Sequence, residues 1–63
     1  MNRQRLIEER DAAFKAQTEA FWAWLRARRT GRPAEEVGAL GLAYEGKVRD
    51  WQDAYQRWGE AVT

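Results

Sequence analysis

Thr30-Gly31-Arg32-Pro33 divides this 63-residue sequence into two long stretches and decides its fold. Glycine readily adopts the left-handed conformation that commonly ends a helix. Proline is favoured in the first turn of a helix, because its fixed φ suits that position and its missing N–H is not needed there. The pair therefore predicts one helix that ends before Gly31 and another that begins at Pro33. A connection this short brings the two helices side by side and antiparallel.

The sequence on both sides of this turn is helical in character. Residues 2–29 contain neither glycine nor proline and consist mostly of good helix formers, with Asn2 available as an N-cap. We therefore predict a single helical-hairpin domain over residues 1–63. Its helices are expected at about 2–29 and 33–60, with the turn at 30–32.

The second helix carries apolar residues on two neighbouring heptad stripes. They are Val37, Tyr44, Trp51 and Trp58 on one stripe, and Gly41, Val48, Tyr55 and Val62 on the other. A seven-residue repeat over this length predicts packing against other helices. Each glycine inside a helix costs up to about 1 kcal/mol relative to alanine. Despite Gly38, Gly41 and Gly46, we expect the second helix to be continuous.

The first helix has two apolar faces. One consists of the large residues Ile7, Phe14, Phe21 and Leu25, and the other, the alanine seam, consists of Ala13, Ala16, Ala20, Ala23 and Ala27. The faces lie about 120° apart around a helix of 3.6 residues per turn. A hairpin supplies only one neighbouring helix, so we expect a second chain to cover the other face. We assign the alanine seam to this dimer interface, because small side chains let helix axes approach closely.

The size of the chain also favours a dimer. A chain of 63 residues buries only about 60% of the surface that its unfolded form exposes. The sequence has no cysteine for a disulfide and no histidine, so oligomerisation remains as a source of stability. We expect an all-α fold in which two antiparallel hairpins dimerise into a four-helix bundle. Its predicted core consists of Phe14, Phe21, Leu25, Tyr44, Val48, Trp51, Tyr55 and Trp58.

Composition narrows the classes of function. Without histidine and cysteine, and with no nucleophile or base beside the paired carboxylates, we predict no enzyme, no metal site and no cofactor. The net charge of +1 argues against general binding of polyanions. The longest apolar stretch, 20–25, is too short to cross a bilayer, so we expect a soluble cytoplasmic protein. The excess of arginine over lysine and the abundant alanine are typical of a GC-rich bacterium or its phage.

The end of the first helix is the strongest candidate for a partner-binding surface. Its residues are Trp22, Arg26, Arg28, Arg29 and Arg32. Trp22 falls on the polar side of the helix, and exposed tryptophan and arginine side chains commonly dominate interfaces. Structural roles are also open, since cations in a last turn offset the helix dipole and Trp22 could lie at the dimer rim. The segment 21–29 also has the composition of an interfacial membrane helix, but interspersed acidic residues disfavour membrane binding.

The architecture and length resemble Rop, the family of plasmid RNA-binding hairpins that dimerise into a four-helix bundle. Arg3-Gln4, Phe14 and the closing Arg57-Trp58-Gly59-Glu60 are similar to the pattern of that family. The resemblance implies nucleic-acid binding by the polar face of the first helix, although the alanine seam and Trp22 have no clear counterpart. Our leading hypothesis is a homodimeric adaptor or inhibitor that binds another protein. The alternatives are a Rop-like RNA- or DNA-binding regulator and a structural subunit of a larger assembly.

Overall fold

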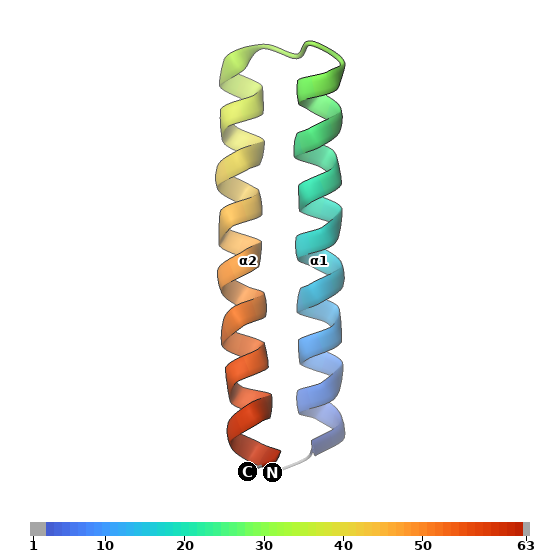
Figure 1. Cartoon of the computed structure of the whole chain (residues 1–63), viewed down its shortest axis with the longest axis vertical. Helices are drawn as coiled ribbons and strands as arrows, with labels where there is room; N and C mark the ends of the chain where they lie inside the picture. Colours follow the sequence, from blue (N-terminus) through green and yellow to red (C-terminus); the bar gives the residue numbers. More distant parts are fainter. Residues whose placement is uncertain (1–2, 63) are drawn as a thin grey trace.

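The computed structural model describes residues 3–62 and is an antiparallel hairpin of two helices, α1 (Arg3–Arg29) and α2 (Ala34–Val62). The two helices lie side by side along the molecule (Figure 1), which is 45 Å long. The prediction of an all-helical hairpin is confirmed, and Asn2, the predicted N-cap, lies outside the described residues. Over these residues, neither helix combines the length and the apolar character that crossing a membrane requires.

The turn ends α1 with a glycine in the left-handed region, at Gly31, where φ is 72°. The N–H of Gly31 donates to the carbonyl of Arg28 at 3.4 Å, and the N–H of Arg32 donates to the carbonyl of Ala27 at 3.0 Å. These are the two hydrogen bonds of a Schellman motif, which satisfies carbonyls that the end of a helix leaves free. Glycine adopts this conformation without the steric cost that a Cβ would bring, which is why the chain turns here.

α2 is one continuous helix, as expected. The glycines inside it are Gly38, Gly41, Gly46 and Gly59. Gly41 allows a close contact with α1, because a Cβ placed there would lie only 3.3 Å from Nε1 of Trp24. The other three have open space around the position of a Cβ. The seam position of Gly41 therefore makes room for a large ring of the opposite helix.

Small side chains of α1, together with Leu6, are among those buried within the hairpin. Ala27 is only 6% exposed and Leu6, on the same heptad stripe, is 8% exposed. The remaining seam residues, Ala13, Ala16, Ala20 and Ala23, are half-buried. Ala23 and Ala27 line one surface hollow together with Leu40 of α2, and Ala54 of α2 is buried. Ala27 is therefore already buried within one hairpin, and the assignment of the alanine seam to a dimer interface stays a prediction. Close approach of the two helices within one hairpin requires small side chains there.

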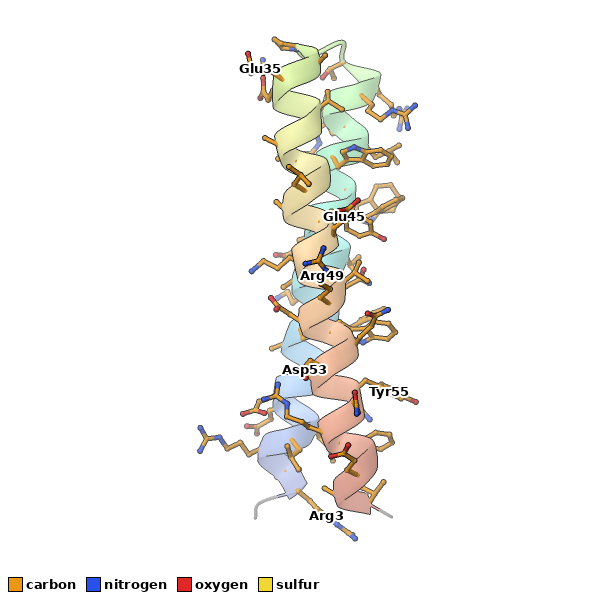
Figure 2. All side chains as sticks on the ribbon, turned by 90° about the vertical axis from the view of Figure 1, so that its left-hand side faces the viewer. Arg3, Glu35, Glu45, Arg49, Asp53 and Tyr55 are labelled. Carbon is orange, nitrogen blue, oxygen red and sulfur yellow. The ribbon has the colours of Figure 1, made fainter. Side chains whose placement is uncertain are left out.

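The aromatic rings gather on one side of the hairpin (Figure 2). We call this side the aromatic face and define it as Phe14, Phe21, Trp24, Tyr44, Trp51, Tyr55 and Trp58. Two ring pairs join the helices: the centroids of Phe14 and Trp51 are 6.0 Å apart, and those of Phe21 and Tyr44 are 5.5 Å apart. Offset or tilted ring pairs at such distances stabilise helix packing beyond the area that they bury.

The predicted core is only partly covered within one hairpin. Phe14 is 52% exposed and Tyr55 is 50% exposed, so their predicted burial does not hold within a single chain. The other six, Phe21, Leu25, Tyr44, Val48, Trp51 and Trp58, are half-buried. Two helices touch along one stripe each, so the large side chains beside that stripe are covered on one side only. Complete burial of these residues requires a further surface.

Candidate partner-binding surface

Two of the four predicted arginines have partners within the chain. The guanidinium of Arg28 lies over the ring of Trp24, 4.9 Å from its centroid. Arg32 donates two hydrogen bonds of 3.0 Å to the carboxylate of Glu36. Through this hydrogen bond and through its charge, the Glu36 carboxylate raises the pKa of Arg32. Arg28 and Arg32 are therefore engaged in local contacts and are less available for a partner.

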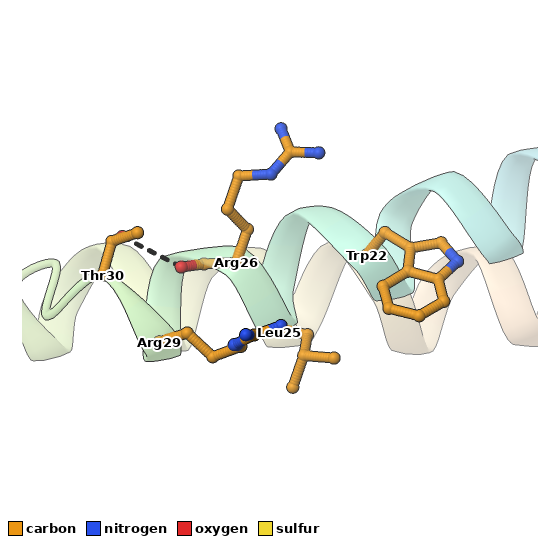
Figure 3. A pocket seen from close by; sticks show the side chains of 5 residues that line it. All are labelled: Trp22, Leu25, Arg26, Arg29 and Thr30. Carbon is orange, nitrogen blue, oxygen red and sulfur yellow. Dashed lines mark hydrogen bonds between the residues drawn. The ribbon is translucent and has the colours of Figure 1, made fainter.

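Arg26 and Arg29 are the two arginines left available. Both are exposed, and neither has an ion pair with a carboxylate in the described part of the chain. They line an open hollow of about 440 Å³ beside Trp22, which is 53% exposed. We call this the Trp22 surface, and it consists of Trp22, Leu25, Arg26, Arg29 and Thr30 (Figure 3). An exposed indole and two unpaired cations therefore share one site.

Helical spacing brings these side chains together. Trp22, Arg26 and Arg29 are separated by four and three residues, the spacing that places side chains on one face of a helix. The hydroxyl of Thr30 donates to the carbonyl of Arg26 at 2.9 Å, which satisfies an acceptor in the last turn of α1. The ring of Trp22 packs edge-on against Phe21, with centroids 5.5 Å apart. Phe21 belongs to the aromatic face, so the ring of Trp22 packs against a ring at the edge of that face.

The Trp22 surface combines two kinds of attraction. Trp22 and Leu25 offer apolar area to a partner, and a guanidinium binds carboxylate or phosphate oxygens through paired N–H donors. The basic residues of the last turn of α1, including Arg26 and Arg29, also interact favourably with the negative, C-terminal end of the helix dipole. That effect is worth about 0.3–1 kcal/mol for an exposed charge and leaves the guanidinium groups free to bind an anion. Both predicted roles, structural and binding, are therefore compatible.

Sequence reasoning placed Leu25 less well. Leu25 was assigned to the core, but it lines the Trp22 surface; its position three residues after Trp22 and four before Arg29 indicates this stripe.

Arg10 lies at the other end of α1, where sequence reasoning assigned it no role. Its guanidinium lies 4.5 Å from the ring centroid of Trp58 and donates to the carboxylate of Asp11 at 3.1 Å.

No protein-family model matches the chain, and no curated protein or solved structure is significantly similar to it. What the chain does is therefore inferred from the Trp22 surface and the aromatic face.

Proposed function

We propose that the chain is a non-enzymatic, homodimeric helical protein that binds another protein as an adaptor or inhibitor. The observation that carries the proposal is the Trp22 surface, where Trp22 is 53% exposed beside two arginines that lack acidic partners within residues 3–62. A large exposed apolar side chain flanked by unpaired cations is typical of a recognition site. The proposal retains the cytoplasmic setting and the bacterial or phage source expected from the composition.

The chemistry of the Trp22 surface favours an acidic protein segment that also carries apolar side chains. Aspartate or glutamate of the partner pairs with Arg26 and Arg29, while an apolar side chain packs on Trp22 and Leu25. An amphipathic helix presents both kinds of group at three- and four-residue spacing, which matches the spacing along α1. The partner class is therefore an acidic, leucine-containing helix.

Nucleic acid is the second candidate, because a ring beside guanidinium groups also suits a base and its phosphate. The charge of the chain favours nucleic acid less than a protein partner. Its net charge is only +1, and Arg5, Arg32 and Arg57 are paired with carboxylates on their own helix or turn. Polyanion binding commonly uses an extended set of unpaired cations, whereas the Trp22 surface has two.

The dimer is part of the proposal because one hairpin has little interior. The most deeply buried residues within 3–62 are Leu6, Ala27 and Ala54, and two of these are alanines. No large side chain among the described residues is fully buried. Two hairpins that share a core as a four-helix bundle would bury the half-exposed rings of both copies.

The test measures binding of two labelled probes, an acidic leucine-containing peptide and a single-stranded oligonucleotide, by fluorescence anisotropy. We expect the peptide to bind, and Trp22→Ala or the double variant Arg26→Ala/Arg29→Ala to weaken its affinity at least about tenfold, equivalent to 1.4 kcal/mol. Arg49→Ala is the matched control, since Arg49 is an exposed arginine of α2 outside the Trp22 surface, and it should leave the affinity unchanged. Circular dichroism checks that each variant keeps its helices.

Salt dependence separates the candidates. Peptide binding that rests partly on apolar contact should weaken modestly as salt rises, whereas oligonucleotide binding should fall steeply. Preferential binding of the oligonucleotide, lost in the double arginine variant, would replace the proposal with the nucleic-acid function. Equal weakening of peptide binding by Arg49→Ala would show that general charge attracts the peptide and would contradict a specific Trp22 surface.

A further inference from the structure

The aromatic face is a second unpartnered surface, separate in role from the Trp22 surface. We infer that a second copy of this chain covers the aromatic face, and that the alanine seam is not where the copies meet. The inference rests on the proposed dimer and specifies its contact. Four observations support it: the total surface area, the dimensions of the face, its composition, and the position of the alanine seam.

The surface area of the hairpin is too large for a compact monomer of its mass. Its accessible surface is 4972 Å². A compact monomer of 7.4 kDa is expected to expose about 4200 Å². The excess of about 770 Å² is close to the roughly 800 Å² that each partner buries in a standard-size interface. Burial of about 800 Å² by each partner would therefore lower the exposed area per chain to that of a compact monomer of the same mass.

The side of the hairpin that carries the aromatic face matches a second hairpin in size. The molecule is 45 Å long, and two helices of about 10 Å diameter lying side by side give this side a width of about 20 Å. The whole side thus measures about 900 Å², the area that one half of a standard-size interface needs. The rings from Tyr44 to Trp58 span about 21 Å of its length, at a rise of 1.5 Å per residue, and a second hairpin has the length and width to cover both them and the residues beyond them.

The composition of the face is that of an interface core. Aromatic side chains are enriched and charges are depleted at the centres of interfaces. The exposed rings of Phe14 and Tyr55 both contact Trp51, so they form one cluster that crosses from α1 to α2. The cations nearest this face, Arg10 and Arg28, lie over the rings of tryptophans. A two-fold symmetric contact would place the same ring cluster on both sides.

The other faces of the hairpin offer smaller apolar side chains or isolated ones. Ala27 of the alanine seam is already buried within the hairpin, the other seam residues are alanines, and the exposed Leu42 has Glu45 and Arg49 three and seven residues further along α2. Ion pairs between Arg5 and Glu9, at 3.4 Å, and between Asp53 and Arg57, at 3.5 Å, lie on exposed stripes of α1 and α2. By elimination, the large apolar area that a dimer would bury is the aromatic face.

The test places a photo-cross-linking phenylalanine derivative, p-benzoylphenylalanine, at Phe14 and, as a control, at Leu42. Phe14 and Leu42 are both exposed, at 52% and 71%, and Leu42 shares its stripe of α2 with Arg49, away from the rings. After irradiation, we expect the Phe14 derivative to form a covalent dimer whose attachment points are aromatic-face residues. The Leu42 derivative should remain at the mass of one chain. The derivative at Phe14 keeps a ring in place, so it preserves the fold better than a charged residue would.

A second pair of variants measures the native association. Phe14→Glu should shift the mass in solution from two chains towards one, whereas Leu42→Glu should leave it at two. The inference would be overturned if Leu42 formed as many cross-links as Phe14. It would also be overturned if the Phe14 derivative attached to the stripe of α2 that carries Leu42 and Arg49. An unshifted dimer mass for a folded Phe14→Glu variant would overturn it as well. Failure of probe binding at the Trp22 surface would leave these results unchanged, so the proposed partner binding and the proposed dimer contact fail independently.

Discussion

Gly41 is the position at which one substitution tests the close contact between α1 and α2. A Cβ added to Gly41 would lie 3.3 Å from Nε1 and 3.4 Å from Cδ1 of Trp24, whereas a Cβ added to Gly38 would have no atom of a neighbour within 4 Å. Alanine in place of glycine inside a helix gains about 1 kcal/mol from backbone entropy and solvation. Gly38→Ala should realise this gain. At Gly41 the ring of Trp24 must shift by a few tenths of an ångström, and overpacking typically costs about 1–3 kcal/mol.

We therefore expect Gly41→Ala to be about 1 kcal/mol or more less stable than Gly38→Ala. For a chain of this size, such a difference corresponds to about 4–8 °C in Tm. The assay is thermal unfolding followed by circular dichroism, at one fixed chain concentration because association raises the Tm. Gly46→Ala is a second control, since Gly46 also has open space around the position of a Cβ. A gain at Gly41 equal to that at Gly38 and Gly46 would refute the close packing of Trp24 on α2.

Four further substitutions test the turn, the alanine seam and the two kinds of tryptophan. Gly31→Ala should lower the free energy of unfolding by about 1–2 kcal/mol in urea titrations, because a Cβ is strained at a φ of 72°. Ala20→Leu should cost about 1–3 kcal/mol by pushing α1 from α2; an unchanged Tm would place the seam in solvent. Trp51→Ala should cost about 3–5 kcal/mol and unfold the chain, whereas Trp22→Ala should preserve the circular dichroism spectrum. Unfolding by Trp22→Ala would assign that ring to the core.

The sequence was sufficient to predict the turn and both helices. Gly31 and Pro33 carry local conformational preferences, and no long-range contact competes with them. As a result, α1 ends at Arg29 as predicted, and α2 begins one residue after Pro33. The glycines of α2 did not break it, because the neighbouring helix supports α2 along its length (Figure 1).

The sequence was not sufficient to decide which apolar face of α1 meets α2. Large residues are expected inside the hairpin and the alanine seam at the dimer contact, but Ala27 of that seam is buried within the hairpin, while Phe14 stays half-exposed. Leu6 provided a signal, because it continues the heptad series of Ala13, Ala20 and Ala27. A stripe that ends in a large apolar residue is more consistent with the inside of the hairpin.

The contacts of the arginines could be predicted from the sequence only in part. Trp24 precedes Arg28 by four residues and Glu36 follows Arg32 by four, so both local contacts could be read from helical spacing. Four arginines close together in sequence suggested one patch. Only their individual contacts show that Arg28 and Arg32 are engaged and that Arg26 and Arg29 remain beside Trp22.

We propose that one hairpin does not complete its own core and that a second copy does. Sedimentation equilibrium of the unmodified chain at micromolar concentration measures this association. We predict twice the chain mass of 7.4 kDa, with a Tm that rises as the chain concentration rises. A monomer of 7.4 kDa that unfolds cooperatively, with a Tm independent of concentration, would contradict the account.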